Sequence, residues 1–509
     1  MRKIGFAAGL LAGAAAAAMA AQASGFACAE LKELRLENVR ITAAERVEPG
    51  WKYPASPFNG SLGPRAVAHS SFCRVALTIE KEIKVEVWLP DIWNQRFEAV
   101  GNGGLTGGIN FPSMADVMRS GFATASTDTG HETPTGFFDS SWVKGHPDRV
   151  ENFGHRAHHL MAMNAKKIIA AYYGTGPKKS YYTGCSSGGW QGLTEAQRYP
   201  EDYDGIVAGA PAINFVRLQA NAFALAWRAR QIPNSDIPYA KLSLIAKAQI
   251  AQCDAQDGVK DGFITDPRQC KFDWSKLLCK KDGGTECLTK AQIARAKTLY
   301  GPQRTPKAQK LYPGKPLGIL ANAPVEYPAG SDPLETLMLP QALKEKPKWT
   351  ATSFDPDRDL PALGKELGPI LNSTNPDLSA FKARGGKLIM YHGWADNVLS
   401  PYNSIDYAAN VTKKTPGAEN FLRLFMVPSM GHCGGGEGPN SFDSNSAIVN
   451  WVEKSEAPDV LIATHTGADG GVTMTRPLCA EPKVAVYKGE GSTNDAANFI
   501  CKMPNKKGE

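Results

Sequence analysis

A short glycine-rich segment, Gly184-Cys185-Ser186-Ser187-Gly188, constrains the fold more than any other part of the chain. The residues before it, 180–183, predict a strand, and residues 189–198 after it predict a helix. A Gly-x-Ser-x-Gly turn between a strand and a helix is typical of a nucleophile elbow, which exposes the serine hydroxyl at the edge of a sheet. A plain structural turn has the same form, and a phosphate cradle is disfavoured because no Gly-Lys-Ser/Thr follows. Ser186 is therefore the candidate nucleophile.

A second short motif, Gly431-His432-Cys433, supplies a histidine suited to accept the serine proton. Each candidate residue stands beside a cysteine. If Ser186 and His432 must meet to react, Cys185 and Cys433 are brought close enough to be bonded. We therefore expect a disulfide that fixes the distance between nucleophile and base. His392, beside the end of another predicted strand, is the main competing histidine for a supporting role.

The distribution of apolar residues predicts an α/β fold class. Short apolar runs alternate with helical patterns from about residue 84 to residue 209, as in a mostly parallel sheet flanked by helices. Residues 212–377 break the pattern and are rich in Pro, Lys and Gly. We expect one catalytic α/β domain, residues 24–211 and 378–509, interrupted by a lid domain over residues 212–377. Strands are predicted at residues 85–89, 97–101, 122–127, 180–183, 204–210, 387–392 and 421–427, and helices at residues 152–173, 189–198 and 445–454. The first of these helices is predicted to turn Leu160, Met163, Ile168 and Ile169 toward the core.

The third member of a catalytic triad is expected between the serine and the histidine in the chain. Asp396 stands in a loop just past the strand predicted at residues 387–392, although on position alone it is as well suited to cap a turn. The negative oxygen formed during acyl transfer needs two backbone N–H donors. Ser187 supplies one, and the loop Gly101-Asn102-Gly103-Gly104 supplies the other, with Gly104 favoured over Gly103. These residues predict a serine esterase.

The segment from Cys253 to Ile264 is dense in carboxylates and glycines and predicts a metal loop. Three aspartates at short spacing, with backbone carbonyls between them, offer the oxygen ligands that Ca²⁺ prefers. The glycine spacing differs from that of an EF-hand, and a solvated acidic turn is the alternative. We expect a structural calcium ion, bound by Asp254, Asp257 and Asp261 with the carbonyls of Val259 and Phe263.

The N-terminus carries the features of an export signal. Arg2 and Lys3 precede an alanine-rich apolar run over residues 4–20, and Ala21-Gln22-Ala23 is a small-residue cleavage pattern. We expect residues 1–23 to be a signal peptide, so that the mature protein is periplasmic or secreted and has no membrane segment. A membrane anchor is the alternative, but the run is shorter than the roughly 20 residues of a spanning helix.

The cysteines and the charge balance also bear on the class of protein. All ten cysteines follow the predicted cleavage site, and an even number in an exported chain favours disulfides. Sequence alone does not give the connectivity, but local spacing favours Cys253 with Cys270, Cys279 with Cys287 and Cys479 with Cys501, which leaves Cys28 and Cys73. The formal net charge is +7, with Lys and Arg scattered and not interleaved with aromatic residues. No nucleic-acid partner is expected.

Taken together, the cysteine-flanked Ser186 and His432, Asp396, the glycine loop at residues 101–104 and the acidic loop at residues 253–270 resemble the tannase and feruloyl esterase family. The likeness covers nearly all of the mature chain. It implies an α/β-hydrolase core with an inserted calcium-binding lid, and five disulfides in the pairs given above. It also implies a small aromatic ester as substrate, because the family acts on esters of aromatic acids.

The resemblance leaves the substrate open. A feruloyl esterase acting on hydroxycinnamate esters is favoured, a tannase acting on gallate esters is second, and a mono(2-hydroxyethyl) terephthalate hydrolase is disfavoured because no lid arginine is placed for the free carboxylate. Outside the enzyme class, the alternative is a non-catalytic, calcium-stabilised binding protein. Oligomeric state is not predicted. The candidate residues for stacking on a substrate ring, each equally suited to a core, are Phe215, Phe223, Trp227 and Trp349.

Overall fold

A computed structural model of the chain describes residues 25–59, 66–133, 137–281, 284–319 and 354–504. The predicted signal peptide and Trp349 lie outside these ranges, as do the side chains of Phe223 and Trp227 within a helix. No helix among the described residues is both long and apolar enough to cross a membrane.

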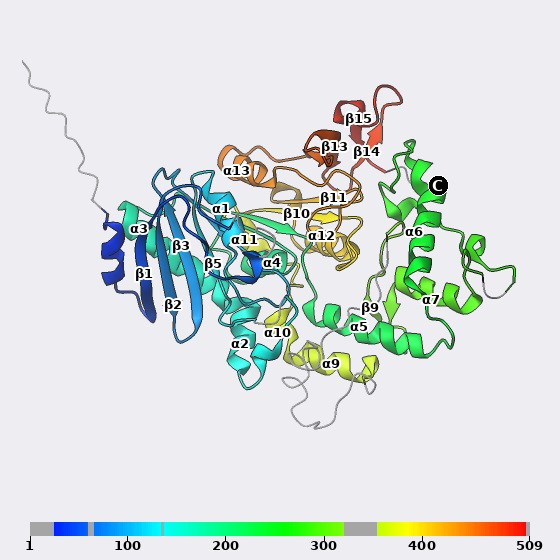
Figure 1. Ribbon diagram of the computed structural model, residues 1–509, viewed down its shortest axis with the longest axis horizontal. Coiled ribbons are helices and arrows are strands. Elements are labelled where there is room, and N and C mark those ends of the chain that lie inside the picture. Colours follow the sequence, from blue (N-terminus) through cyan, green and yellow to red (C-terminus); the bar gives the residue numbers. More distant parts are fainter. Residues whose placement is uncertain (1–24, 60–65, 134–136, 282–283, 320–353, 505–509) are drawn as a thin grey trace, which may run out of the picture.

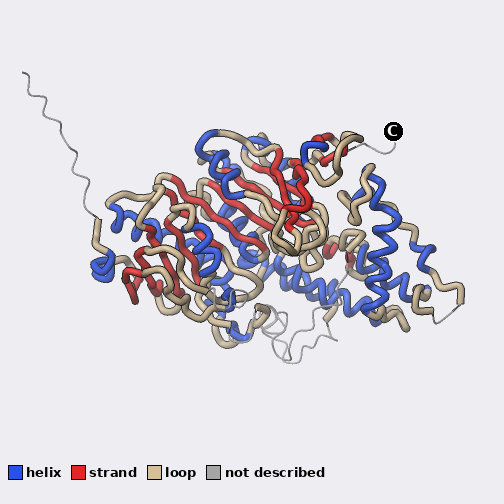
Figure 2. Tube along the Cα trace, turned by 45° about the horizontal axis from the view of Figure 1, so that its top comes forward, coloured by secondary structure: helices blue, strands red, loops and turns tan. Residues whose placement is uncertain are grey.

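A nine-stranded mixed sheet forms the centre of the molecule, in the order β1-β2-β3-β5-β4-β6-β7-β10-β11. Figure 2 shows the strands as one continuous twisted layer with helices on both sides. The first four strands in this order pair antiparallel, and the rest, from β5 to β11, pair parallel. The strands span Val39–Val47 (β1), Phe72–Ile79 (β2), Ile83–Pro90 (β3), Arg96–Val100 (β4), Ala123–Thr127 (β5), Lys179–Cys185 (β6), Gly205–Gly209 (β7), Lys387–Gly393 (β10) and Leu422–Val427 (β11).

Two separate hydrophobic cores cover the two faces of this sheet. On one face, buried side chains from α3 and α4 pack with Phe381 and Val411 of the later helices. On the other face, α1 and α13 contribute Phe111, Met114 and Trp451. Because both faces are covered, the parallel strands are buried along most of their length. The helices are α1 (Phe111–Met118), α3 (Ala157–Tyr173), α4 (Ser187–Arg198), α11 (Ser379–Ala383), α12 (Tyr402–Lys414) and α13 (Ser444–Lys454), with α2 (Pro147–Glu151) and the π-helical turn η5 (Asn152–Arg156) before α3.

A long insertion separates two strands that are neighbours in the sheet. β7 and β10 pair directly, with Val207 opposite Ile389, yet they are far apart in the chain. Figure 1 shows α5, α6 and α7 of the intervening segment to one side of the sheet. Buried residues of α6 and α7 form a cluster around Ile245 and Leu299, whereas Phe215 of α5 packs with Trp190 of α4. The segment contains α5 (Phe215–Arg230), α6 (Tyr239–Cys253), α7 (Lys290–Tyr300), β8 (Gln303–Arg304), β9 (Lys310–Tyr312), α9 (Pro356–Glu366) and α10 (Gly368–Leu371).

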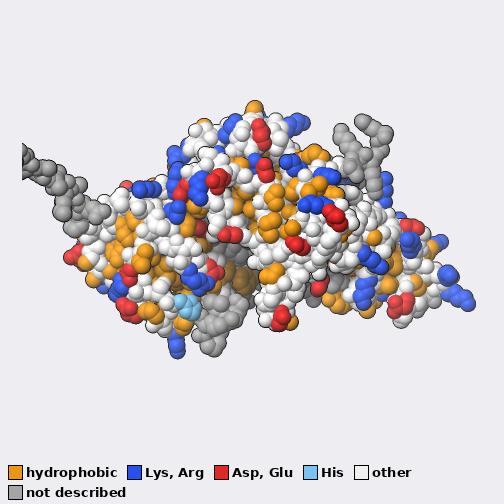
Figure 3. All heavy atoms as spheres, turned by 90° about the horizontal axis from the view of Figure 1, so that it is seen from above, with side chains coloured by type: hydrophobic (Ala, Val, Ile, Leu, Met, Phe, Trp, Pro, Cys, Tyr) orange, Lys and Arg blue, Asp and Glu red, His pale blue; other side chains and the backbone are white. Residues whose placement is uncertain are grey.

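The C-terminal residues add two small antiparallel ribbons beside β11. β12 (Val460–Thr466) pairs with β13 (Val472–Cys479), and β14 (Val484–Tyr487) pairs with β15 (Phe499–Lys502). A disulfide between Cys479 and Cys501 joins the two ribbons. On the face shown in Figure 3, basic and acidic side chains are interspersed over the surface.

The seven predicted strands and three predicted helices are all present, and their bounds differ from the predicted ones by a few residues at most. The longest predicted helix is the exception, because its first turn is the π-helical η5. The prediction that Met163 points toward the core is wrong, because Met163 is 38% exposed, whereas Met161 is fully buried. The buried face of α3 runs through Met161, Ala165 and Ile168, and Met163 lies about 200° around the helix from Met161. Leu160 packs at the edge of the core, and Ile168 and Ile169 are buried as expected.

Candidate active site

Ser186 occupies a sharp turn between β6 and α4. Its backbone has φ 63° and ψ −121°, a conformation that is strained for a residue with a side chain. The glycines of the motif allow this turn, because a Cβ on Gly184 would lie 2.5 Å from the backbone of Gly188, and one on Gly189 would lie 2.2 Å from the Gly209 carbonyl oxygen. The Ser186 N–H donates to that same Gly209 oxygen at 2.9 Å, which anchors the turn to β7. The motif therefore forms the predicted elbow.

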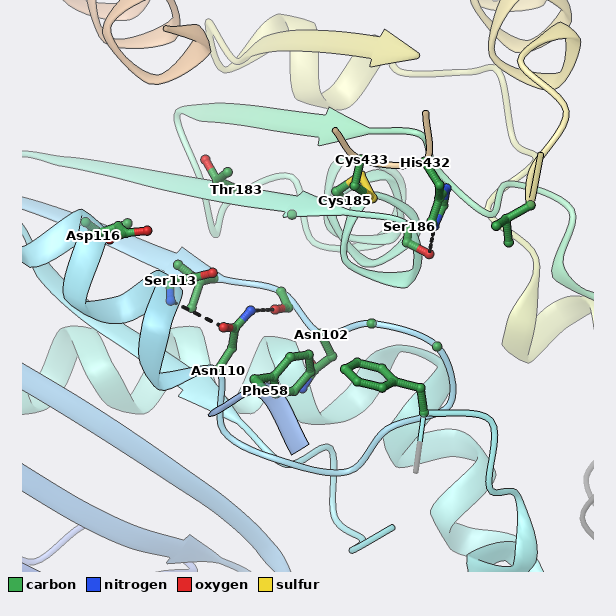
Figure 4. A pocket seen from close by; sticks show the side chains of 18 of the residues that line it. Phe58, Asn102, Asn110, Ser113, Asp116, Thr183, Cys185, Ser186, His432 and Cys433 are labelled. Atoms are coloured by element: carbon green, nitrogen blue, oxygen red, sulfur yellow. Dashed lines mark hydrogen bonds between the residues drawn. A yellow bond between two sulfur atoms is a disulfide. The ribbon is translucent and has the colours of Figure 1, made fainter. Parts of the chain in front are cut away.

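A chain of hydrogen bonds joins the three predicted triad residues. His432 Nε2 lies 2.9 Å from Ser186 Oγ, and His432 Nδ1 lies 2.7 Å from Asp396 Oδ2. Figure 4 shows the serine hydroxyl and the imidazole facing each other at the wall of a cavity. An ionised Asp396 only accepts hydrogen bonds, so His432 donates from Nδ1 and leaves Nε2 free to accept from the serine hydroxyl. This is the tautomer that can remove the serine proton.

Asp396 is fully buried and is held by several donors. Burial by itself would raise its pKa, but hydrogen bonds from His392 and His432 hold the pKa well below the usual value. The backbone N–H groups of Val398 and Leu399 each donate to Oδ1 at 2.8 Å. The carboxylate therefore stays ionised beside the imidazole.

His392 supports the triad from behind, which is the role that the sequence suggested for it. Its Nε2 lies 3.1 Å from Asp396 Oδ2, and its Nδ1 lies 2.8 Å from Ser404 Oγ. The side chain is fully buried behind Asp396. His392 thus fixes the carboxylate from behind, whereas His432 is the histidine that reaches Ser186.

The disulfide expected between Cys185 and Cys433 is present, with the two Cα atoms 5.9 Å apart. It joins the residue before the nucleophile to the residue after the base, across 248 positions of sequence. Figure 4 shows the bond beside the hydrogen bond from Ser186 to His432. The four other expected pairs are also bonded: Cys28–Cys73, Cys253–Cys270, Cys279–Cys287 and Cys479–Cys501.

The two residues predicted to bind the oxyanion come from adjacent backbones. Ser187 Oγ donates to the Gly104 carbonyl oxygen at 2.6 Å, which ties the glycine loop to the first turn of α4. Gly104 has φ +59°, and a Cβ there would lie 2.3 Å from the Phe137 carbonyl oxygen, so only glycine fits. The site also lies at the N-terminus of α4, where the helix dipole favours negative charge.

A cavity of about 620 Å³ begins at Ser186 and His432. Its wall includes three phenylalanine side chains, Phe58, Phe137 and Phe138, of which Phe58 and Phe137 meet edge to face with centroids 5.5 Å apart. Phe137 and Phe138 are 41% and 44% exposed, a high fraction for phenylalanine. The cavity is therefore suited to hold an aromatic ring close to the nucleophile.

The cavity continues past the Cys185–Cys433 disulfide toward α1, where its wall becomes polar (Figure 4). Thr183 and Asn445 lie there, and the Asn445 amide donates to Glu98 Oε1 at 3.0 Å. Burial raises the pKa of Glu98 to about 7, against the hydrogen bonds from Thr183 and Asn445. Ser113 and Asp116 of α1 complete this end of the cavity.

Of the four aromatic residues suggested by the sequence, only Phe215 has a described side chain, and it does not line the cavity. Phe215 is 1% exposed and packs against Phe153 and Trp190 in a core, so it has no free face for a substrate ring. The sequence signal for this wall is the Phe137-Phe138 pair. Adjacent aromatic residues in a loop, outside any predicted strand, indicate exposed side chains.

The predicted calcium loop forms a compact turn after α6. The Asp254 carboxylate accepts the N–H groups of Asp261 and Gly262, both at 3.1 Å, which brings the two ends of the loop together. Asp261 Oδ2 accepts from Arg476 at 2.8 Å, whereas its Oδ1 is buried without a hydrogen-bond partner. A buried, unpartnered carboxylate oxygen and two neighbouring aspartates are a donor set that fits a hard cation.

The predicted carbonyl ligands and the spacing of the acidic side chains also bear on a metal site. Val259 and Phe263, whose carbonyls are the other predicted ligands, are both 3% exposed. Within the described ranges, the one group of three Asp, Glu, His or Cys ligand atoms lying within 4.8 Å of one another is His159, Glu195 and Asp202, so the three loop aspartates are spaced more widely. His159 Nδ1 is hydrogen-bonded to Asp202 at 2.6 Å, which already occupies that nitrogen.

Comparison with known proteins places similarity along nearly the whole chain. The sequence model described as "Tannase and feruloyl esterase" matches residues 65–331 and 345–502. An uncharacterized esterase of Xanthomonas campestris pv. campestris is 35% identical, with 93% of this chain and 91% of that protein covered. Probable feruloyl esterase B-2 of Aspergillus oryzae is 32% identical, over 97% of this chain and 98% of the relative. The crystal structure of feruloyl esterase B from Aspergillus oryzae superposes with a TM-score of 0.82 at 28% identity, covering 94% of this chain and 100% of that one.

Proposed function

The chain belongs to the tannase and feruloyl esterase family and is a carboxylic ester hydrolase, and from this premise we propose that it cleaves hydroxycinnamate esters as a feruloyl esterase. The observation that carries the proposal is the hydrogen-bonded chain from Ser186 through His432 to Asp396 at the wall of a cavity with three phenylalanines. Feruloyl esterase is favoured over tannase because relatives above 30% identity over nearly their full length carry that name.

In the proposed mechanism, His432 takes the proton of Ser186 as Oγ attacks the ester carbonyl carbon. Asp396 holds the imidazole through Nδ1 and stabilises the imidazolium that forms. His432 then gives the proton to the leaving alcohol, and an acyl-serine remains. A water molecule, activated by the same histidine, hydrolyses this acyl-enzyme and releases the aromatic acid.

The negative oxygen of each tetrahedral intermediate is bound, in this proposal, by the N–H groups of Ser187 and Gly104. The Ser187–Gly104 hydrogen bond supports this role because it holds the two backbones together next to Ser186, where Gly104 lines the cavity. Both donors are fixed before substrate binds, so their stabilisation of the transition state needs little reorganisation.

We further propose export and a structural calcium ion. Five disulfides fit folding in an oxidising compartment, periplasmic or extracellular, which is the expected consequence of a signal peptide at residues 1–23.

In the proposed calcium site, Asp254, Asp257 and Asp261 would hold the ion with the carbonyls of Val259 and Phe263. The unpartnered Asp261 oxygen supports this set.

Replacing Ser186 with alanine tests the proposal. We expect hydrolysis of methyl ferulate to fall by at least about 1000-fold, because the nucleophile is removed while the fold is kept. A panel of methyl ferulate, methyl caffeate, chlorogenate, methyl gallate and mono(2-hydroxyethyl) terephthalate then ranks the substrates of the wild type. Retained turnover in the S186A variant would disprove the assignment of Ser186 as the nucleophile. A preference of the wild type for methyl gallate would identify the chain as a tannase.

A further inference from the structure

The two proposed oxyanion donors belong to different elements, so something must fix their separation. Gly104 lies in the loop after β4, and Ser187 begins α4. Both N–H groups must point at one oxygen atom, and a misplacement of roughly 1 Å in such a site can cost about 100-fold in rate. A rigid connection between this loop and this helix is therefore a requirement of the mechanism.

Asn102 and Gln191 form that connection by exchanging hydrogen bonds. The Asn102 backbone N–H donates to Gln191 Oε1 at 3.0 Å, and Gln191 Nε2 donates back to Asn102 Oδ1 at 3.3 Å. Gln191 lies one helical turn after Ser187 and so faces the same side of α4. The pair thus links the middle of the glycine loop to the helix that carries the other donor.

The pair is buried, and most of its polar side-chain atoms have hydrogen-bond partners. Asn102 and Gln191 are 4% and 2% exposed. Gln191 Oε1 also accepts from the Tyr182 hydroxyl at 3.2 Å, and the Asn102 amide donates to the carbonyl oxygens of Gly108 and Thr127, both at 2.9 Å. With these partners the orientations of both side-chain amides are fixed, since a flip of either would place like groups together.

His158 supports the network from α3. Its Nε2 lies 2.9 Å from Asn102 Oδ1, which can only accept, so the ring carries its proton on Nε2. Burial lowers the pKa of His158 to about 3, so the ring is neutral at working pH. A neutral donor holds the loop without bringing a charge near the oxyanion.

Two glycines let the loop and the helix touch. A Cβ on Gly101 would lie 2.6 Å from Gly188 Cα, and a Cβ on Gly188 would lie 2.9 Å from the Asn102 carbonyl oxygen. The backbones are therefore in direct contact near the Asn102–Gln191 pair. The Ser187–Gly104 hydrogen bond joins the same loop and the same helix.

We propose that Gln191 is a positioning residue for ester hydrolysis, which through Asn102 sets the separation between the Gly104 and Ser187 N–H donors. The inference rests on the proposed function, because it needs an oxyanion at this point. It assigns to Gln191 an effect on the transition state and not on substrate binding, since Gln191 itself lies behind the cavity wall and is nearly fully buried.

The test replaces Gln191 with methionine, which keeps the volume and removes every hydrogen bond. We expect kcat on methyl ferulate to fall about 10- to 100-fold with KM within about twofold, because only transition-state contacts are lost. An aryl trifluoromethyl ketone forms a tetrahedral adduct with Ser186 and places its oxygen at the same donors, so its affinity should fall by the same factor. Affinity for the product ferulate and the pH profile of kcat should be unchanged.

Gln197 provides a matched control on the same helix. It donates to the Ser373 carbonyl oxygen and to the Tyr407 hydroxyl, both at 2.8 Å, and faces away from the loop. Gln197→Met should leave kcat and ketone affinity unchanged. If it lowers both as much as Gln191→Met does, the effect is damage to α4, and the inference is overturned.

A second variant, Gln191→Glu, keeps the oxygen that accepts from Asn102 and Tyr182 and serves if the methionine variant does not fold. It should show a smaller loss of kcat with KM again unchanged. Wild-type kcat in either folded variant, or a loss confined to KM, would refute the positioning role. An inactive wild type that also fails to react with a fluorophosphonate would instead refute the proposed function.

Discussion

At the scale of single residues, the site is governed by how buried polar groups are paired. Asp396 is fully buried and stays ionised because two histidines and two backbone N–H groups point at it. His158, by contrast, is buried as a neutral ring and gains only one side-chain hydrogen bond. The first arrangement favours charge and the second excludes it, although both side chains are buried.

The neutral state of His158 predicts a pH-dependent stability. Its pKa is lowered to about 3 in the folded protein from 6.5 in the unfolded chain, so the unfolded state takes up a proton first as the pH falls. This difference in proton uptake hardly changes the free energy of unfolding above about pH 7 and lowers it by about 2 kcal/mol at pH 5. Replacing His158 with glutamine, which can still donate to Asn102, removes it.

Chemical denaturation of both proteins at pH 7 and pH 5 measures the effect. Between these values, the free energy of unfolding of the wild type should drop by about 2 kcal/mol more than that of H158Q. Other buried groups, such as Glu98, cancel in this difference because both proteins contain them. An identical drop in the two proteins would mean that His158 titrates normally in the fold.

At the scale of elements, the site joins the loops that follow β4, β6, β10 and β11 at one edge of the sheet. The Cys185–Cys433 disulfide links two of these loops directly. Replacing both cysteines with serine should lower the free energy of unfolding by about 2–5 kcal/mol, because a long loop of the unfolded chain is no longer closed. It should also lower kcat by about 10-fold as Ser186 and His432 lose their fixed separation.

The Cys279–Cys287 disulfide offers the comparison, since it closes only 8 positions within the inserted segment. Its double serine variant should keep kcat within about twofold of the wild type. Steady-state kinetics and thermal melting on both variants separate the two cases. Equal kcat values in the two double variants would show that the first disulfide only stabilises the fold.

The elements of the site were largely predictable from sequence, and its supporting network was not. Ser186, His432 and Asp396 stand after apolar strands, where the chemistry demands particular residue types at particular places in the chain. β1 was not predicted because it is an edge strand with only two of its nine residues buried, so its apolar pattern is weak. Gln191 and His158 act through contacts across 89 and 56 positions, which no local pattern reveals.

At the scale of the whole molecule, ion pairs attach the inserted segment to the C-terminal residues around the predicted calcium loop. Arg476 of β13 binds Asp261 at 2.8 Å and is 2% exposed. Arg268 binds both Asp266 and Glu481, and its guanidinium lies 5.3 Å from the centre of the Trp394 ring, two residues before Asp396. Loosening the loop is therefore expected to weaken the attachment of the segment.

Removing calcium should lower the melting temperature by several degrees, because an ion bound only by the folded state stabilises it by about 3 kcal/mol at 100 times its Kd. kcat on methyl ferulate, measured well below the melting temperature, should change less than about twofold. Calorimetry with EGTA, then with calcium restored, measures the first effect. A melting curve indifferent to chelator would identify the segment as a solvated acidic turn.

The direct pairing of β7 with β10 has a consequence for how such proteins diversify. The polypeptide departs from the central layer and rejoins it at adjacent positions, so the intervening stretch behaves as a cassette. Exchanging that cassette between relatives would leave the attacking hydroxyl, its imidazole and the sulfur bridge beside them in register. The described wall of the cavity at Ser186 includes no residue of that stretch, so the pocket that receives the ester would also survive the exchange.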